Sequence, residues 1–110
     1  MITFVTPSPQ QLLTSLKEAI RKGHITTWSE ENGYLTHTPN QWARKAWLLP
    51  SIQGNELRFA IINSQGSNVT TEVYAVYHGR FIETMLAHFD KQFTNGFASS
   101  MPTVADRVAA

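Results

Sequence analysis

Four histidines are the side chains whose chemistry this chain could use most readily. Neutral imidazole exchanges protons near pH 7, and a neighbouring arginine can hold an anion. If the segment around His78 is helical, this histidine lies one turn from Tyr74, while His37 is expected beside Trp28 on a hairpin. The candidate ligand pocket between helix and sheet comprises Trp28, His37, Tyr74, Tyr77, His78 and Arg80. Core packing is the commoner explanation of such a pattern, and both interpretations stay open.

The chain lacks the residue patterns that a metal site, a catalytic nucleophile or a phosphate-binding loop requires. The histidines show no His-x₃-His spacing and no carboxylates cluster with them, so no metal site is expected. The chain has no cysteine, which excludes disulfides and thiolate nucleophiles. It has neither a glycine-rich phosphate loop nor a Gly-x-Ser-x-Gly motif. We therefore expect no cofactor, assign no catalytic residue and favour a protein that is not an enzyme.

Two of the three tryptophans, Trp42 and Trp47, flank the basic pair Arg44 and Lys45. Aromatic and basic side chains together can stack on nucleic-acid bases, but tryptophan and arginine also anchor protein interfaces. Nucleic-acid binding normally requires a basic patch, whereas nine Lys and Arg here face eight Asp and Glu, for a formal net charge of +1. Protein contact or core packing is therefore favoured over binding of single-stranded nucleic acid.

Two helices are expected to position these side chains. Ser8 and Pro9 form a start signal, and apolar residues then recur at helical spacing until Gly23, which predicts a helix over residues 9–22. The segment from Val69 to Phe93 is ambiguous, because residues 73–77 have strand composition. Helical periodicity gathers its aromatic residues on one arc, so a helix over residues 71–92 is favoured over a strand followed by a helix.

Two hairpins are expected between these helices. Asn32-Gly33 is a strong type I′ turn signal and places Trp28 opposite His37. Residues 46–52 and 56–62 predict a second hairpin, in which Pro50 indicates an edge strand or a bulge. Both of its faces are apolar: one carries Leu48, Ile52, Leu57, Phe59 and Ile61, and the other carries Trp47, Leu49, Ala60 and Ile62. Because a solvated face should be polar, something is expected to cover the second set.

The predicted fold class is α+β, in the order α-β-β-(short α)-β-β-α. A four-stranded, mainly antiparallel sheet packs against two main helices on one face, with a short helical turn over residues 39–44. Residues 1–94 form the single domain, and residues 95–110 are expected to be a flexible tail.

Composition favours a cytoplasmic protein with part of its surface covered. The N-terminal residues lack the charged and apolar regions of a signal peptide, and no apolar run approaches the roughly 20 residues that span a membrane. Charged residues make up 15% of the chain, below the usual proportion of about a quarter. Such a surface favours a homodimer or another protein partner, and the short apolar runs predict no membrane association.

Two segments, residues 38–50 (TPNQWARKAWLLP) and 72–81 (EVYAVYHGRF), resemble a family of small uncharacterised bacterial proteins. The resemblance extends over roughly residues 10 to 93. It implies a bacterial origin, and because that family has no assigned activity, no function follows from it.

Three hypotheses of function remain open at this stage. The first is a non-catalytic binding or regulatory module that self-associates through Trp47, Leu49, Ala60 and Ile62. The second is a small-molecule-binding protein or enzyme that uses the His/Tyr/Arg pocket. The third is a weak binder of single-stranded nucleic acid that uses Trp42, Arg44, Lys45 and Trp47.

Overall fold

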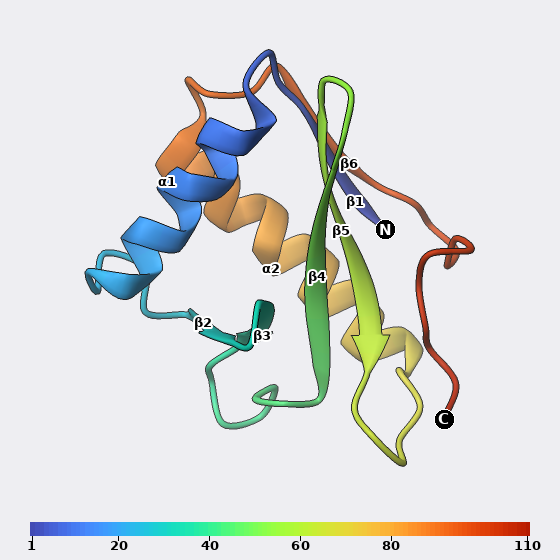
Figure 1. Ribbon diagram of the computed structural model, residues 1–110. Coiled ribbons are helices and arrows are strands. Elements are labelled where there is room, and N and C mark those ends of the chain that lie inside the picture. The colour runs from blue at the N-terminus through green and yellow to red at the C-terminus, as the bar shows by residue number, and fades with distance from the viewer.

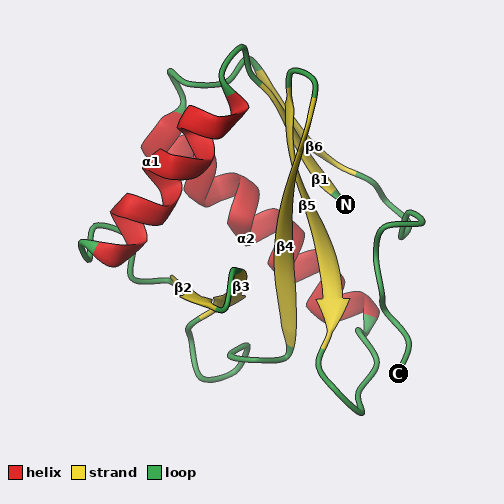
Figure 2. Ribbon diagram, viewed as in Figure 1, coloured by secondary structure: helices red, strands yellow, loops and turns green.

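A six-stranded antiparallel sheet with two helices on one face forms the molecule, and a computed structural model describes all residues from Met1 to Ala110 (Figure 1). The elements in chain order are β1 (Ile2–Val5), α1 (Pro9–Arg21), β2 (Trp28–Glu31), β3 (Tyr34–His37), β4 (Ala46–Gln53), β5 (Glu56–Asn63), α2 (Thr71–Phe89) and β6 (Asn95–Ala98). The strands lie in the order β2-β3-β4-β5-β1-β6. Figure 2 shows both helices on the same side of the long β4–β5 hairpin.

The prediction of a four-stranded sheet is wrong, because β1 and β6 add two strands. β1 pairs with β5 on one side and with β6 on the other, so that Ile2 lies opposite both Phe59 and Ala98. β1 is only four residues long, and β6 is exposed along its whole length, so neither has the local signal of a strand. Their pairing joins opposite ends of the chain, which no local sequence pattern reports.

Residues 95–110, which the sequence placed outside the domain as a tail, lie along the sheet. Beyond β6, Arg107 forms a parallel bridge with Ile62, at the part of β5 that β1 does not reach. The Arg107 amide donates to the Ile61 carbonyl at 2.9 Å, and the Asn63 amide donates to the Arg107 carbonyl at 2.7 Å. We call residues 99–108 the C-terminal strap.

Both main helices are confirmed, and the ambiguous segment is helical. In α2, Tyr77, Phe81 and Met85 follow one another at four-residue spacing and are all fully buried. The Thr70 hydroxyl caps this helix by accepting from the Val73 amide at 3.1 Å. α1 starts at the predicted proline, but the Ser8 side chain makes no capping hydrogen bond. Residues 39–44 form hydrogen-bonded turns and no helix.

The two predicted hairpins are confirmed with their registers. Trp28 pairs with His37 across β2 and β3. All eight residues of β4 pair one-to-one with β5, so no bulge occurs at Pro50. β3 pairs with β4 only through Leu35 and Leu48, which leaves β4 without a neighbour on that side at Pro50. The missing N–H of proline therefore costs no sheet hydrogen bond there.

The two faces of the sheet differ in what covers them. On the helix side, a cluster of 17 buried hydrophobic residues joins α1 and α2 to the strands. The residues of β4 and β5 that point the other way are those paired at Trp47–Ile62 and Leu49–Ala60. We call this other side the second sheet face, and neither helix covers it (Figure 1).

Candidate functional site

The second sheet face carries a continuous apolar patch built from three neighbouring strands. Its members are Tyr34 on β3, Trp47 and Leu49 on β4, and Ala60 and Ile62 on β5. Ala60 and Ile62 are buried among their neighbours, whereas the other three are half-buried. None of the five is charged. An antiparallel sheet that faces water normally presents polar side chains, so this patch is out of place on a solvated surface.

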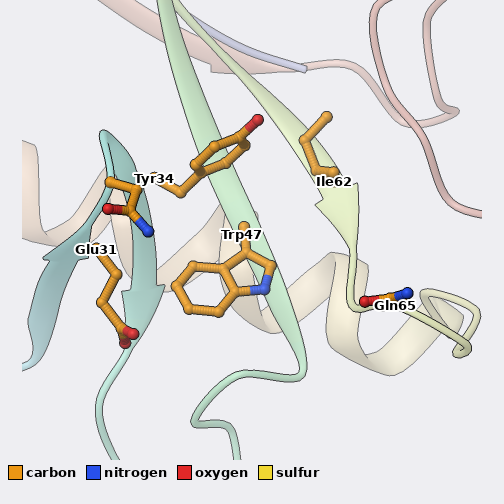
Figure 3. A pocket seen from close by; sticks show the side chains of 6 residues that line it. Glu31, Tyr34, Trp47, Ile62 and Gln65 are labelled. Atoms are coloured by element: carbon orange, nitrogen blue, oxygen red, sulfur yellow. The ribbon is translucent and has the colours of Figure 1, made fainter.

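A groove of about 460 Å³ opens at one end of this patch (Figure 3). Its lining residues are Glu31, Asn32, Tyr34, Trp47, Ile62 and Gln65. The rings of Tyr34 and Trp47 meet edge to face, with centroids 6.5 Å apart and an interplanar angle of 80°. In Figure 3 these side chains stand in front of β3, β4 and β5, with a helix behind the sheet. The groove therefore belongs to the second sheet face and is separate from the core.

Local sequence explains how the walls of the groove are placed. Asn32 and Gly33 both have positive φ, as the type I′ turn requires, and they fix Glu31 opposite Tyr34. The one-to-one register of the second hairpin sets Trp47 beside Ile62. Glu31 also binds Arg44 at 3.0 Å, so the charge at this end of the face is internally neutralised.

The opposite end of the second sheet face carries a second ion pair and a half-exposed aromatic ring, which lines a hollow of about 330 Å³ together with residues of the C-terminal strap. Arg58 binds Glu56, with its Nε 2.8 Å from the carboxylate. Phe97 pairs with Thr3, which in turn pairs with Arg58, so all three side chains lie on this face. The Phe97 side chain is 51% exposed although it belongs to a strand of the sheet. Neither Tyr34 nor Phe97 was predicted from the sequence to belong to this face, although Phe97 stands out there as a large aromatic residue among small ones.

Of the six residues predicted to line a ligand pocket, three meet inside the core. The ring centroid of Trp28 lies 4.5 Å from that of His37 and 5.6 Å from that of Tyr77. The Trp28 indole N–H donates to the Thr84 hydroxyl at 3.1 Å, and the Tyr77 hydroxyl binds Thr36. None of the cavities at the surface is lined by these three rings. They form solid core packing at this position.

His37 is held neutral in this core cluster. Its Nδ1 lies 2.7 Å from the Thr27 carbonyl, which therefore accepts the ring proton, and its Nε2 has no hydrogen-bond partner. Burial lowers the pKa of His37, and the Arg80 charge lowers it further. Arg80 itself is exposed on α2 and lines no cavity with the other predicted residues.

Tyr74 and His78 belong to a different cluster, around the amino group of Met1. Their rings stack with centroids 3.8 Å apart. The amino group lies 3.0 Å from His78 Nε2, 3.0 Å from Asp106 Oδ2 and 3.2 Å from the Ser99 hydroxyl. This cluster joins the start of β1, α2 and the C-terminal strap, and it was not predicted from the sequence.

Their surroundings in the amino-group cluster lower the pKa values of both His78 and Asp106. Burial, together with the charge of the neighbouring ammonium group, lowers the pKa of His78 from 6.5 to about 4. Burial alone would raise the pKa of Asp106, but hydrogen bonds from the Thr103 amide and the Met1 ammonium bring it below its ordinary value. At neutral pH the His78 imidazole is therefore neutral and Asp106 is a carboxylate.

The four residues of the nucleic-acid hypothesis are divided between two hollows. Trp42, Arg44 and Lys45 line a hollow of about 530 Å³ beside the start of α2, whereas Trp47 lies in the groove of the second sheet face. Arg44 is already bound to Glu31. The arrangement therefore provides no row of aromatic and basic groups along which a strand could stack.

Two further properties of the structure bear on function. No group of three or more His, Asp or Glu side chains is placed to hold a metal ion. Neither helix combines the length and the hydropathy that crossing a bilayer requires.

No family model, curated protein or solved structure matches this chain. The resemblance of residues 38–50 and 72–81 to small bacterial proteins therefore stays a prediction.

Proposed function

We propose that this protein is a non-catalytic binding or regulatory module that acts as a homodimer joined through the second sheet face. The observation that carries the proposal is the apolar patch that neither helix covers. Both helices pack on the opposite face, while Tyr34, Trp47 and Leu49 remain partly exposed to water. Burying such a patch against a partner removes apolar surface from water, which is favourable by about 25 cal/mol for each Å² buried.

The distribution of polarity over this face supports an interface. Its centre is apolar. There the small side chain of Ala60 lies opposite Leu49 and next to Ile62 on the same face of β5. Charged side chains lie toward its ends, as the pairs Glu31–Arg44 and Glu56–Arg58. An apolar centre that is poor in charge and surrounded by polar groups is the usual anatomy of a protein–protein interface.

The charges on the face support a second copy of the chain as the partner. In a two-fold dimer each face meets itself, so a patch of one sign would repel its own copy. Here each acidic residue of the face already has a basic partner at hydrogen-bond distance. The chain as a whole has a formal net charge of only +1. Long-range repulsion between two copies is therefore small.

The size of the molecule is compatible with a stable dimer. An interface of ordinary size buries about 800 Å² on each partner. That area corresponds to about one eighth of the 6184 Å² accessible surface of this chain, which one sheet face of a small domain can supply.

Native mass spectrometry and sedimentation of untagged protein test this proposal. We expect a dimer for the wild type, and a monomer for the Trp47→Glu/Ile62→Lys double variant, which places charges at the centre of the patch. Leu86→Glu is the control, because Leu86 is an apolar residue on α2, outside the second sheet face, and is 53% exposed. We expect this control to remain a dimer.

Two results would contradict the homodimer. One is a monodisperse wild-type monomer at high micromolar concentration. The other is a monomer that carries additional bound mass, which would identify a small-molecule ligand in place of a second copy. Thermal unfolding of each variant shows whether a loss of the dimer reflects the interface or a loss of the fold.

A further inference from the structure

The second sheet face carries both a hollow and a projection. The hollow is the groove between Tyr34 and Trp47, and the projection is the half-exposed ring of Phe97. We propose that, in the homodimer, Phe97 of each copy inserts into the Tyr34–Trp47 groove of the other copy. This inference rests on the proposed dimer and specifies its geometry.

Phe97 cannot reach the groove of its own chain. β6 is separated from β4 by β1 and β5, which makes three strand spacings of about 4.8 Å each. Along the strands, Phe97 is level with Arg58, four residues from Ile62, and this adds about 13 Å. The ring and the groove are therefore roughly 20 Å apart on a stiff sheet, so only another molecule can bring them together.

A two-fold axis can exchange the two features because they lie on the same face. An axis in the plane of the interface, midway between ring and groove, places each Phe97 over the groove of the other copy. Ala60 lies close to this midpoint, in the row between Arg58 and Ile62. Its side chain is small and adds little bulk at the centre, while Thr103, Val104 and Ala105 of the C-terminal strap lie beside Phe97 and would also contact the other copy.

The chemistry of the groove suits an aromatic ring. Its volume of about 460 Å³ exceeds the roughly 150 Å³ of an apolar cavity that holds benzene. The walls formed by Trp47 and Tyr34 offer edge-to-face contacts, which aromatic pairs prefer to a face-to-face sandwich. The charge of Glu31 is already bound by Arg44, so inserting an uncharged ring leaves no carboxylate unpaired.

Disulfide trapping tests this geometry directly, because the chain has no cysteine of its own. We would mix two single-cysteine variants, Phe97→Cys and Gln65→Cys, and oxidise them under mild conditions. Gln65 is an exposed lining residue of the groove. We expect a disulfide between the two variants. Leu86→Cys in place of Gln65→Cys is the control and should give no such product.

The affinity of the dimer provides a second readout. We expect Phe97→Ala to raise the dimer Kd about 30-fold, the size of effect typical of an aromatic hot spot. Phe97→Trp, which retains an aromatic ring, should raise it less. Because this side chain lies mostly outside the core, circular dichroism and thermal unfolding should show a folded chain in both variants.

The results separate the geometry from the dimer itself. A wild-type dimer with no Phe97→Cys/Gln65→Cys product and an unchanged Kd for Phe97→Ala would overturn the inserted ring and leave the dimer in place. A Phe97→Cys variant that forms disulfides mainly with itself would also overturn it, in favour of β6 pairing edge to edge. A monomeric wild type would overturn both proposals.

Discussion

The carboxylate of Asp106 lies 3.0 Å from the amino group of Met1 and joins the two ends of the described chain. Its other oxygen accepts from the Ile61 amide at 2.8 Å, where β5 extends beyond β1. Asp106 also accepts from the Thr103 amide, and its side chain is fully buried. One carboxylate thus fixes the C-terminal strap to both β1 and β5.

We expect Asp106→Ala to lower the free energy of unfolding by about 3 kcal/mol, because breaking a buried ion pair leaves its partner uncompensated. The Ile61 amide also loses its acceptor. Urea denaturation at pH 7 measures this loss. Asp90→Ala is the control, since Asp90 is the only other aspartate, is exposed, and should change stability by less than about 0.5 kcal/mol. Equal losses in both variants would contradict a special role for Asp106.

The stability of the protein should fall in mild acid because of His78. Its pKa is about 4 in the folded state and 6.5 in the reference state, so the unfolded chain binds the proton first as the pH falls. The contribution of His78 is complete above pH 6.5 and is lost between pH 6.5 and about 4. The slope for one such group is at most about 1.4 kcal/mol per pH unit.

His78→Gln removes this titration and should flatten the pH dependence, as measured by urea unfolding from pH 7.5 to 4.5. His37 adds to the slope in the same direction, because burial lowers its pKa as well. The curve of the variant should therefore become shallower without becoming flat. His24→Gln is the control, since His24 is exposed. A slope that is unchanged in His78→Gln would disprove the assignment.

The Thr84 hydroxyl should stabilise the core as the acceptor for the Trp28 indole N–H, at 3.1 Å. Thr84→Val keeps the shape but leaves that donor unsatisfied, which costs about 1–3 kcal/mol. Thr84→Ser keeps the hydroxyl and removes one methyl group, so it should cost less than Thr84→Val. The midpoints of thermal unfolding, compared between the two variants, check this order, and the reverse order would be inconsistent with the hydrogen bond.

Two glycine-to-alanine substitutions should change the free energy of unfolding in opposite directions. A Cβ added at Gly96 would lie 2.9 Å from the ring of Phe4, which is fully buried, so Gly96→Ala should destabilise by about 1–3 kcal/mol. Gly79 is inside α2 with nothing near its missing side chain, so Gly79→Ala should stabilise by up to about 1 kcal/mol. Chemical denaturation of both variants measures these changes. A neutral Gly96→Ala would show that β6 does not pack against Phe4.

Residues with local partners could be placed from the sequence. The turn at Asn32 and Gly33 sets the Trp28–His37 pair, and this register is correct. The second hairpin follows in the same way, including its two apolar faces. The stripe of Tyr77, Phe81 and Met85 identifies α2 as a helix. In each case the information is held within a few turns of helix or one short loop.

The candidate site could be predicted only in part for the same reason. Trp47 and Ile62 are paired by one hairpin, so their shared face could be derived from the sequence. Tyr34 reaches Trp47 only because β3 pairs with β4 at Leu35 and Leu48, and a single pair of residues leaves no periodic signal. The expected pocket required His37 and His78 to share one cavity. In the structure His37 packs against Trp28 in the core, whereas His78 stacks on Tyr74 in the amino-group cluster.

The two helices, the two hairpins and the apolar second face follow from local sequence, because caps, turns and periodicity act over short stretches of chain. The positions of β1, β6 and the C-terminal strap instead depend on pairing between distant parts of the chain. Phe97 reaches the second sheet face because β6 pairs with β1 from the far end of the chain. That pairing depends on hydrogen bonds between backbones and on closing a long loop, and neither depends on a local pattern of side chains.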